Sequence, residues 1–476
     1  MSPAAQPIGA VVLAAGRSTR FRSARSKLVH PLAGKPVISW LLGSLDELAV
    51  TPVVVVVPQH ADELRITCGD GVRFAVQAEP RGTGHAVQAA EAALADFDGS
   101  LLLLYGDLPL LRAETLTRLV EAHRAGGGAL TLATGIIDDP HGWGRIVRSD
   151  GRVAGIVEQR DATAAQRAIR EVNVGLYCVR ARLLFDLLRR VRPDNAQGEL
   201  YLTDIIGLAA ADGVAIADLP VDLAEVAQIN SRAELAAVER QVRTRIVAGW
   251  MDAGVSFEDP ATAYIGPDVR IGRDSVIGPN VHLRGRTVLG ERCRLDGSAF
   301  LTDATLADDV VLRFSVVLTE ADVGPGCQIG PFAHLRPATR LGAGVHIGDF
   351  VETKNARLGD GSKANHLAYL GDVEIGRDVN IGAGTITCNY DGFAKHRTVI
   401  GDRVQVGSDT TLIAPLTIGD DAYIATATTV RHDVPPGGVL VFNPRDQQER
   451  PGWVEAFRAR ARADKAKPPR KPRKPR

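Results

Sequence analysis

Side chains that could bind phosphate and a metal ion follow two of the apolar runs in the N-terminal half. After the first run, residues 8–13, come the small residues 14–16 and then the cations Arg20 and Lys27. Small residues let backbone N–H groups approach phosphate oxygens, and the two cations add positive charge. Asp107 follows a later apolar run, where a carboxylate at the end of a strand can bind Mg²⁺ jointly with phosphates. An aspartate that only caps a helix is the alternative interpretation.

A histidine in the C-terminal half could act as a general base. An imidazole titrates near neutral pH and can take a proton from an amine that attacks a carbonyl carbon. His366 lies in the run 365–372, which interrupts an otherwise regular pattern. A lone histidine is more often packed or solvated, and four others are interpreted in that way: His282, His334, His346 and His432.

Strands that alternate with helices would position the first group of side chains. The predicted strands are residues 8–13, 53–57, 74–77 and 101–105, and the predicted helices are 61–66, 84–94, 113–123 and one that begins near Pro36. This alternation predicts an α/β domain with a Rossmann-like, mostly parallel sheet that binds ligands at the carboxyl ends of its strands.

A repeat of six residues would position the histidine. Between residues 264 and 430 an aliphatic residue recurs at this spacing, usually followed by glycine, with short slips and one insertion after residue 392. The aliphatic positions are Ile265, Ile271, Ile277, Leu283, Leu289, Leu295, Leu301, Ile329, Leu335, Leu341, Ile347, Leu358, Leu370, Ile375, Ile381, Ile400, Val406, Leu412, Ile418, Ile424 and Val430. This period fits neither a helix nor an alternating strand and predicts a parallel β-helix of hexapeptide repeats. The glycines are expected where a Cβ would crowd a corner and the dihedral angles are strained.

Composition indicates a globular protein of more than one domain. The chain has 476 residues, 45% apolar and 24% charged, which predicts two or three domains. No apolar run reaches the length needed to cross a bilayer and the start does not resemble a signal peptide, so we expect a cytoplasmic protein. Five scattered cysteines are expected to be reduced thiols without a disulfide framework or zinc site: Cys68, Cys178, Cys293, Cys327 and Cys388.

Four segments are predicted. Residues 1–231 form the α/β domain, 232–251 a helical linker arm, 252–450 the β-helix, and 451–476 a basic, disordered tail rich in Pro, Lys and Arg. Net charge is zero, yet residues 458–476 carry ten Lys or Arg and one acid. The tail is interpreted as solvated, and contact with a polyanion stays open.

These motifs, with others in a fixed order, resemble one bacterial family from near residue 8 to near residue 450. The family is the bifunctional N-acetylglucosamine-1-phosphate uridylyltransferase/glucosamine-1-phosphate N-acetyltransferase. The segments that carry the resemblance are 13–20, Lys27, Gln77, 82–86, 105–109, 142–145, 156–158, 171–175, 195–204, Asn230, 335–337, 351–354, 365–372, Asn380 and 386–392.

The resemblance implies an α/β nucleotide-diphospho-sugar transferase domain followed by a left-handed β-helix that forms a homotrimer. It implies that acetyl-CoA acetylates glucosamine-1-phosphate, and that UTP with Mg²⁺ then converts the product into UDP-N-acetylglucosamine and pyrophosphate. Both substrates of each step are small molecules, and no membrane is involved.

The resemblance also assigns site residues. Binding of UTP and UDP-N-acetylglucosamine would involve Leu13, Ala14, Ala15, Gly16, Lys27, Gln77, Gly82, Thr83, Tyr105, Gly106, Asp107, Gly144, Glu158, Asn173 and Asn230. Arg20 and Lys27 would stabilise phosphates, and Asp107 and Asn230 would bind Mg²⁺. The catalytic base would be His366, the sugar-phosphate site Arg336, Lys354, Tyr369, Asn380 and Lys395, and the acetyl-CoA site Ala383, Asn389, Tyr390, Ser408, Thr426 and Arg445.

Several positions depart from the family pattern. They are Ser18 and Ala338 in place of glycine, Ser26 in place of proline, Val174, Gln228, residues 425–427, and Arg445, which is not in clean register. We expect Ser18 to weaken or adjust UTP binding, since its Cβ could crowd the triphosphate.

Two other functions stay open at this point. A nucleotidyltransferase whose β-helix only oligomerises or regulates would share the N-terminal motifs but would have no need for the cluster around His366. A noncatalytic scaffold would explain the hexapeptides and leave Lys27 and Asp107 without a purpose.

Overall fold

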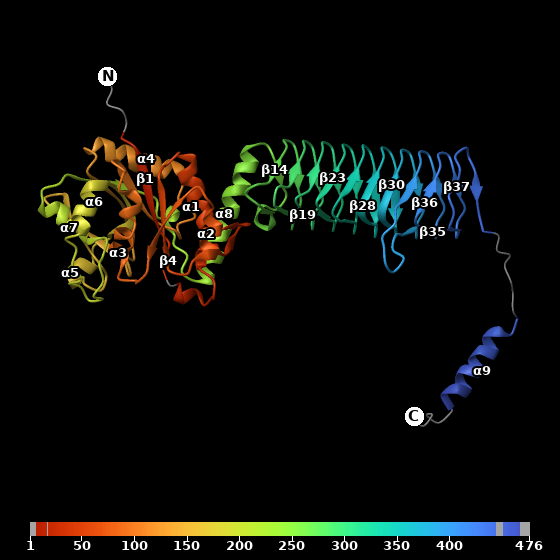
Figure 1. Ribbon diagram of the computed structural model, residues 1–476, viewed down its shortest axis with the longest axis horizontal. Helices are drawn as coiled ribbons and strands as arrows, with labels where there is room; N and C mark the ends of the chain where they lie inside the picture. The colour runs from red at the N-terminus through yellow and green to blue at the C-terminus, as the bar shows by residue number, and fades with distance from the viewer. Residues whose placement is uncertain (1–5, 17, 444–450, 467–476) are drawn as a thin grey trace, which may run out of the picture. The chain divides into compact units, whose positions relative to one another are not determined.

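The computed structural model describes residues 6–16, 18–443 and 451–466, and the chain divides into two compact units, residues 1–309 and 310–476. The first unit holds an α/β sheet, a long helix and the first coils of a β-helix; the second holds further coils (Figure 1). The division falls among the coils of the β-helix, so it does not coincide with the predicted segment boundaries. Those boundaries stay a prediction.

A nine-stranded sheet forms the centre of the first unit. Its strands are β1 (Ile8–Leu13), β4 (Val53–Pro58), β5 (Arg73–Gln77), β6 (Ser100–Tyr105), β7 (Leu130–Ile136), β8 (Gly144–Ser149), β9 (Arg152–Val157), β10 (Glu171–Arg180) and β11 (Ile216–Pro220). The order is β11-β7-β10-β6-β1-β4-β5, with β8 and β9 beside β10. β1 pairs in parallel with β4 and β6, and β4 with β5, whereas β10 is antiparallel to β6 and β7. The predicted Rossmann-like, mostly parallel sheet is confirmed, with antiparallel pairing at β10 and between β8 and β9.

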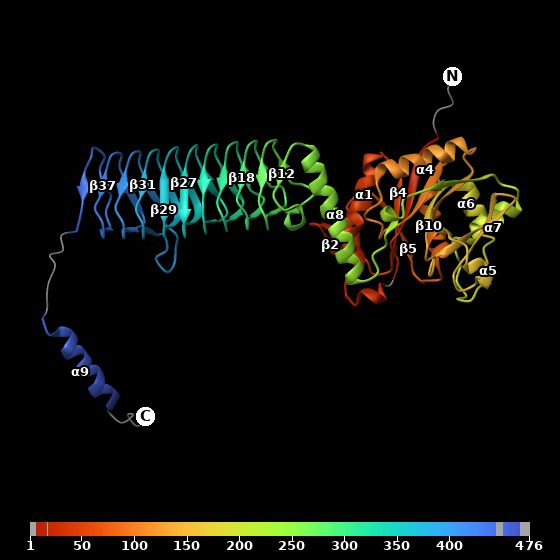
Figure 2. The ribbon, with the colours of Figure 1, turned by 180° about the vertical axis from the view of Figure 1, so that it is seen from behind.

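Helices cover both faces of this sheet (Figure 2). They are α1 (Val37–Glu47), α2 (Asp62–Cys68), α3 (Thr83–Gln88), α4 (Ala113–Ala125), α5 (Ala164–Arg167), α6 (Ala181–Leu188), α7 (Asp204–Ala211) and α8 (Arg232–Asp252), with short helices η1 (Thr19–Phe21), η2 (Lys27–Val29), η3 (Ala92–Leu94), η4 (Leu223–Val226) and η5 (Pro260–Thr262) and the hairpin β2 (Pro31–Leu32) and β3 (Lys35–Pro36). In β4, Val55 packs in a core with α1, α4 and α8, and Val54 packs in the opposite core with α3, α6 and α7. A strand covered on both faces is therefore apolar at every position.

The remaining strands of the first unit form coils of a β-helix. They are β12 (Ser256–Phe257), β13 (Tyr264–Ile265), β14 (Arg270–Ile271), β15 (Val276–Ile277), β16 (His282–Arg284), β17 (Val288–Leu289), β18 (Arg294–Leu295), β19 (Phe300–Thr302) and β20 (Thr305–Leu306). Tyr264 pairs in parallel with His282, and His282 with Phe300. Partners are thus 18 residues apart, which is three steps of six per coil.

The second unit continues with the same kind of coil. Its strands are β21 (Val311–Leu312), β22 (Val317–Thr319), β23 (Ala321–Val323), β24 (Gln328–Ile329), β25 (His334–Leu335), β26 (Thr339–Leu341), β27 (His346–Asp349), β28 (Glu352–Leu358), β29 (Lys363–His366), β30 (Tyr369–Ile375), β31 (Asn380–Ile381), β32 (Ile386–Cys388), β33 (Thr398–Ile400), β34 (Gln405–Val406), β35 (Thr411–Ile413), β36 (Leu416–Ile418), β37 (Tyr423–Ile424), β38 (Thr429–Val430) and β39 (Leu440–Val441). In both units the parallel coils are consistent with the predicted left-handed β-helix.

The aliphatic residues of the repeat all point inward. Each of them is buried, and the most exposed, Ile271, retains only 7% of its surface. For the glycines that follow them, the expected crowding of a Cβ is confirmed, but the expected strain in the dihedral angles is wrong at Gly272. A Cβ on Gly272 would lie 2.4 Å from the carbonyl carbon of Gly290 in the next coil, and the φ angle of Gly272 is not in the left-handed region. Left-handed corners are occupied instead by residues such as Asp274 and Asn280, which tolerate that conformation.

One insertion interrupts the stacking of coils. Val373 in β30 pairs with Thr398 in β33, 25 residues later, instead of 17 or 18. The additional residues form a loop that leaves the coil near residue 390 (Figure 1), as the break in the repeat predicted. Tyr390 and Lys395 bridge the base of this loop.

Two helices can be compared with the predicted linker arm and the predicted tail. The expected helix at 232–251 is observed as α8, and Ser231 and Glu234 close its N-terminus with a capping box. Where a disordered tail was predicted, residues 453–466 form helix α9 (Trp453–Ala466), because this part is rich in alanine and arginine, which favour helices. Residues 467–476 lie outside the described residues. Within the described chain, the helices are either too short or too polar to cross a bilayer, and the five cysteines are not joined in disulfides.

A buried histidine in the first unit predicts acid sensitivity. His123 is 1% exposed, with Nε2 2.8 Å from Ser100 Oγ and Nδ1 3.1 Å from Thr131 Oγ1. Burial, aided by the charges of Arg180 and Arg124, lowers the pKa of His123 from 6.5 to about 4. The stability due to neutral His123 is therefore present above pH 6.5 and is lost as the pH falls toward 4, by up to about 3 kcal/mol.

We expect the urea midpoint of the protein to fall between pH 7 and pH 4.5, and His123→Gln to reduce that dependence. Urea titrations followed by tryptophan fluorescence measure it. His141→Gln is the matched control, because His141 lies exposed in a loop. A variant His123→Gln with the pH dependence of the wild type would contradict the assignment.

Candidate active sites

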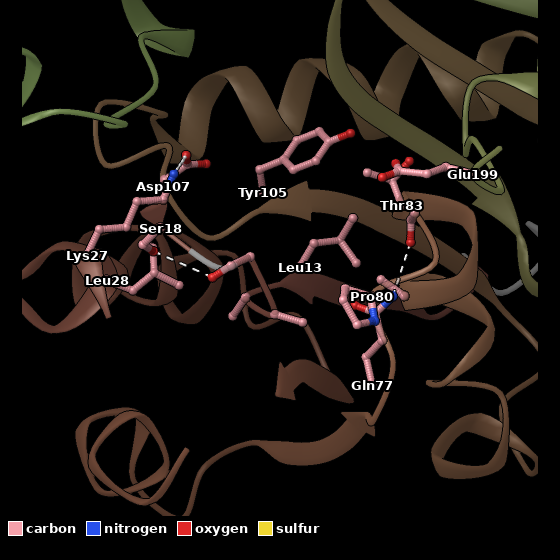
Figure 3. Close-up of a pocket in the computed structure, with 15 residues that line it drawn as sticks. Leu13, Ser18, Lys27, Leu28, Gln77, Pro80, Thr83, Tyr105, Asp107 and Glu199 are labelled. Carbon is pink, nitrogen blue, oxygen red and sulfur yellow. Dashed lines mark hydrogen bonds and ion pairs between the residues drawn. The ribbon is translucent and has the colours of Figure 1, made fainter. Parts of the chain in front are cut away.

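A cavity of about 250 Å³ opens at the carboxyl ends of β1, β5 and β6 (Figure 3). Parallel pairing brings Leu13 at the end of β1 beside Tyr105 at the end of β6. The predicted nucleotide residues that line the cavity are Leu13, Ala14, Ala15, Gly16, Lys27, Gln77, Gly82, Thr83, Tyr105 and Asp107. Gly106 lies behind it and donates its N–H to Leu13 O at 3.0 Å. Segments far apart in the sequence therefore meet at one cavity.

Three polar side chains converge on the floor of this cavity. Lys27 Nζ donates to Asp107 Oδ2 at 2.5 Å and to Asn230 Oδ1 at 2.8 Å. The side chains of Lys27 and Asp107 are 13% and 9% exposed, so the ion pair is shielded from water. The two oxygens thus face a single cation position.

The oxygens of Asp107 and Asn230 fit the predicted Mg²⁺ site. Mg²⁺ is usually held in proteins by one or two carboxylates together with substrate phosphates and water. Among residues 6–16, 18–443 and 451–466, no group of three or more His, Cys, Asp or Glu side chains could hold a metal. A metal ion at Asp107 would therefore have Asn230, water and, when substrate is bound, phosphate oxygens among its other ligands.

Three residues predicted to bind UDP-N-acetylglucosamine, Gly144, Glu158 and Asn173, are not in the lining of the cavity. Gly175 is so close to Tyr105 that a Cβ on it would overlap the ring at 2.5 Å. Asn173 Oδ1 accepts from Gly175 N at 3.1 Å and from Tyr177 Oη at 3.0 Å. A Cβ on Gly144 would lie 3.3 Å from Glu158 Oε1. Strands β8, β9 and β10 thus place these residues as one group on the far side of Tyr105.

Burial changes the titration of the acids in this group. It raises the pKa of Glu158, whose Oε1 accepts from Thr203 Oγ1 at 3.2 Å. Burial, with the charges of Glu158 and Asp161, raises the pKa of Asp204 to about 6. Burial and the charges of Glu158 and Asp107 also raise the pKa of Tyr105, which therefore stays a neutral hydrogen-bonding group.

Five lining residues were not among those predicted to bind: Ser18, Leu28, Pro80, Ala86 and Glu199. Glu199 reaches the cavity because the segment 199–202 is hydrogen-bonded to the loop before α3. Leu200 N donates to Arg81 O at 2.8 Å, and Leu202 N donates to Thr83 Oγ1 at 3.0 Å. The motif 195–204 was the available signal, but its role depends on this long-range pairing.

The phosphate loop shows the consequence of two departures. Ser18 has φ 50° and ψ 29°, the left-handed region that glycine adopts at no steric cost. Ser26 caps η2, and its Oγ accepts from Leu28 N at 3.4 Å. Arg20 is exposed in η1 and does not line the cavity. Of the two predicted phosphate-binding cations, only Lys27 thus lines the cavity.

In the second unit, His366 is paired with a residue that the sequence did not single out. His366 Nδ1 lies 2.6 Å from Asp349 Oδ1, because β29 pairs with β27 in a register that aligns the two residues. The His366 side chain is 61% exposed. A carboxylate at Nδ1 orients the ring and leaves Nε2 facing solvent.

The predicted acetyl-CoA residues continue the row that begins with Asp349 and His366. The pairings of β29 with β31, β31 with β34, and β34 with β37 set the register from coil to coil. They place the row at one corner of successive coils: Asp349, His366, Ala383, Ser408 and Thr426. The residue after each is in the left-handed region, including Leu367, Gly384 and Ala427. The members of the row that follow His366 have small side chains: Ala383, Ser408 and Thr426. They leave an open strip along this edge.

Cations gather on the adjoining face of the coils. Arg336 Nη1 donates to Glu352 Oε1 at 2.7 Å, and Glu352 is aligned with Tyr369. A hydrogen bond and the positive charge of Lys354 lower the pKa of Lys395. The two ammonium groups therefore lie close enough to repel each other, an arrangement that an anion would relieve.

Asp372 lies beneath these cations. Burial raises its pKa, but hydrogen bonds from Asn355 and Asn389 and the charges of Lys354 and Lys395 lower it further, so the net shift is downward. Asn355 Nδ2 donates to Asp372 Oδ1 at 2.7 Å. Asn389 is held by the other carboxylate oxygen, which fixes the base of the inserted loop.

The other predicted residues of this unit are more dispersed. Asn380 lies on the face of β29 and β31, one coil after Lys363. Tyr390 is 60% exposed, and its hydroxyl donates to Gly392 O at 2.6 Å. Arg445 lies outside the described residues.

Known proteins resemble this chain over nearly its whole length. Residues 10–195 match the family described as "MobA-like NTP transferase domain". The chain is 46% identical over 451 residues to the protein named "Bifunctional protein GlmU" of Pelobacter propionicus, covering 94% of this chain and 98% of that protein. It is 47% identical over 451 residues to the protein of the same name of Trichlorobacter lovleyi, with coverage of 93% and 97%, and 45% identical over 459 residues to that of Kineococcus radiotolerans, with 95% and 93%.

A solved structure shows a more distant likeness. It is titled a putative glucose-1-phosphate thymidylyltransferase from Bacillus anthracis in complex with a sucrose, and it is 17% identical to this chain. The TM-score is 0.42, with coverage of 50% of this chain and 95% of that one. A likeness of this extent carries no argument about the site.

The position of Ser18 in the cavity lining leads to a prediction for its replacement by glycine. Ser18 lines the cavity, where its Cβ would take space from a bound triphosphate. We expect Ser18→Gly to tighten UTP binding about fivefold, the equivalent of about 1 kcal/mol. Isothermal titration with UTP and Mg²⁺ in the absence of sugar phosphate measures the change.

Ser18→Ala is the matched control, since it keeps the Cβ and removes only the hydroxyl. It should bind UTP as the wild type does. If alanine weakens binding and glycine fails to improve it, the hydroxyl contributes to binding and the crowding interpretation is wrong.

Proposed function

This chain belongs to the family of bifunctional GlmU proteins, and from that premise we propose how its two candidate sites make UDP-N-acetylglucosamine. The row at His366 transfers the acetyl group of acetyl-CoA to glucosamine-1-phosphate. The cavity at Lys27 and Asp107 then transfers the uridylyl group of UTP to the acetylated sugar phosphate. The observation that best supports the proposal is that the residues predicted for each reaction lie together in one unit. Those for uridylyl transfer are in the first unit, and those for acetyl transfer are in the second.

Uridylyl transfer is an in-line displacement. A phosphate oxygen of N-acetylglucosamine-1-phosphate forms a bond to the α-phosphorus of UTP, the bond from that phosphorus to the β-phosphate oxygen breaks, and pyrophosphate leaves. Two anions have to approach each other, so positive charge in the cavity does most of the work. Lys27 binds a phosphate, Gln77, Gly82 and Thr83 bind the uracil, and Glu158 and Asn173 orient the sugar.

Asp107 and Asn230 would hold Mg²⁺ in this cavity. A bound ion there would supply a Lewis acid that neutralises negative charge on the phosphates. Asp107 is 7% exposed, so its charge acts on a partner within the cavity and not on bulk solvent.

Acetyl transfer needs a base beside the amine of glucosamine-1-phosphate. His366 Nε2 takes a proton from the nitrogen as that nitrogen forms a bond to the thioester carbon. The carbon–sulfur bond then breaks, and the CoA thiolate leaves. Asp349 holds the imidazole and stabilises the imidazolium that forms.

The cations next to His366 would bind the phosphate of the sugar. Lys354 and Lys395 repel each other without a ligand, and Arg336 and Tyr369 lie on the same face. Asn380 would complete the sugar site. Ala383, Ser408 and Thr426 would line the CoA arm, because a strip of small residues leaves room along the edge.

An exposed apolar row at the same corner supports a homotrimer. Phe332 stacks on Phe350 with ring centroids 5.3 Å apart, and Phe314 lies 5.9 Å from Phe332. Leu367, directly after His366, continues the row and is 61% exposed. A second copy that covered this row would enclose His366.

We place the enzyme in the cytoplasm, where UTP and acetyl-CoA are formed. Binding of a polyanion by the basic tail stays a proposal.

Separate inactivation of the two sites tests the proposal. His366→Ala should lower acetyl transfer by about 10²–10⁴, the usual contribution of a general base, and leave uridylyl transfer nearly intact. Asp107→Ala should do the reverse. Thiol release from acetyl-CoA and pyrophosphate release from UTP report the two reactions in the full-length protein.

His346→Ala is the control for removal of an imidazole from the same unit. Equal loss of both reactions in either variant would contradict two separate sites. Unchanged acetyl transfer in His366→Ala would leave a nucleotidyltransferase whose β-helix only oligomerises.

Asp349 generates a second prediction for the same reaction. Asp349→Asn keeps the size of the side chain but no longer fixes the proton on Nδ1 of His366, so acetyl transfer should fall at least about tenfold. Uridylyl transfer should not change. Asp378→Asn, at an exposed corner of the same unit, is the matched control, and an Asp349→Asn enzyme with wild-type acetyl transfer would contradict the positioning role.

A further inference from the structure

Lys27 occupies the position that the predicted metal ion would need. Its ammonium group is 2.5 Å from Asp107 Oδ2 and 2.8 Å from Asn230 Oδ1. These oxygens come from the end of β6 and from the loop before α8, 80 and 203 residues from Lys27 along the chain. A lysine ammonium has three N–H donors, and these two oxygens use two of them.

A metal ion and this ammonium group cannot share the position. Lys27 Nζ bridges Asp107 Oδ2 and Asn230 Oδ1, and Mg²⁺ binds oxygen ligands at about 2.0–2.1 Å, so an ion held by both oxygens would overlap Lys27 Nζ. Two cations at that separation in a water-poor site repel each other strongly. Binding of the metal therefore requires Lys27 to leave Asp107.

The local structure permits this exchange without a change of the backbone. Leu28 and Val29, which follow Lys27 in η2, are 3% and 4% exposed, and Ser26 caps the helix. The four-carbon side chain of Lys27 is the part that can turn. Lys27 also lines the nucleotide cavity (Figure 3), so its released ammonium group stays inside that cavity.

We propose that Lys27 holds the place of the metal in the metal-free protein and becomes a phosphate-binding group only when a divalent cation displaces it from Asp107. The inference rests on the proposed function, in which Asp107 and Asn230 hold the metal. It adds a coupling between ligands. The metal-free cavity neutralises its own buried carboxylate and keeps its phosphate-binding cation occupied, while metal binding releases that cation for the phosphates.

Binding of Mn²⁺ to the nucleotide-free, full-length protein tests the exchange. The free Mn²⁺ signal in electron paramagnetic resonance gives the dissociation constant without any turnover. Lys27→Met removes the competing ammonium group and keeps the length of the side chain, so Mn²⁺ should bind about tenfold tighter or more than to the wild type. Lys35→Met is the matched control, because Lys35 is partly exposed and pairs with Asp268 at 2.8 Å; it should not change Mn²⁺ binding.

Asp107→Asn separates failure of this inference from failure of the proposed function. If Asp107→Asn weakens Mn²⁺ binding but Lys27→Met binds Mn²⁺ no tighter than the wild type, the metal site stands and the exchange is wrong. If Asp107→Asn leaves Mn²⁺ binding unchanged, the metal site itself is wrong and the exchange falls with it.

Crystals soaked in Mn²⁺ without nucleotide distinguish displacement from a general effect of charge. The anomalous signal of Mn²⁺ should lie on Asp107, with Lys27 Nζ no longer within hydrogen-bond distance of that carboxylate. Mn²⁺ on Asp107 with the Lys27–Asp107 hydrogen bond intact would overturn the proposal.

Discussion

Parallel strand pairing is the constraint on which both candidate sites depend. In a parallel pair the ends of the strands lie at the same edge, so residues that follow different strands meet there. In the α/β sheet this aligns Leu13 with Tyr105 and opens a cavity beside Asp107. In the β-helix it aligns Asp349 with His366 and continues the row through the following coils. One bonding pattern thus collects distant residues in two different architectures.

The elements of this fold could be predicted because burial imposes a period on the sequence. β4 is apolar throughout since helices cover both faces of its sheet, and the six-residue period follows from three inward positions per coil of 18 residues. Ile271 and the other aliphatic residues of the repeat are accordingly buried. The crowding at the glycines was predictable too, but the strained dihedral angle expected with it is absent at Gly272, where only the neighbouring coil excludes a Cβ.

Contacts between side chains could not be predicted in the same way. The motifs indicated Lys27, Asp107 and Asn230 separately, but no periodicity states that one ammonium group bridges the other two. Asp349 escaped notice because its role comes from the register of β27 and β29, and not from a motif of its own. Helix α9 was not predicted, because the alanine- and arginine-rich residues 453–466 were treated as one segment with the Pro-rich residues 467–476.

The two sites differ in how much water reaches them, and this difference determines what each requires. Lys27 and Asp107 are 13% and 9% exposed, so the first cavity supplies its own low-dielectric surroundings, in which a fixed cation acts strongly on phosphates. His366 is 61% exposed at a corner of the β-helix, where water can reach the imidazole. The chain therefore shields the Lys27–Asp107 cavity from water but leaves His366 open to it. The apolar row of Phe332, Phe350 and Leu367 lies at that same corner, where contact with another copy would exclude water from His366 without any change in the first cavity.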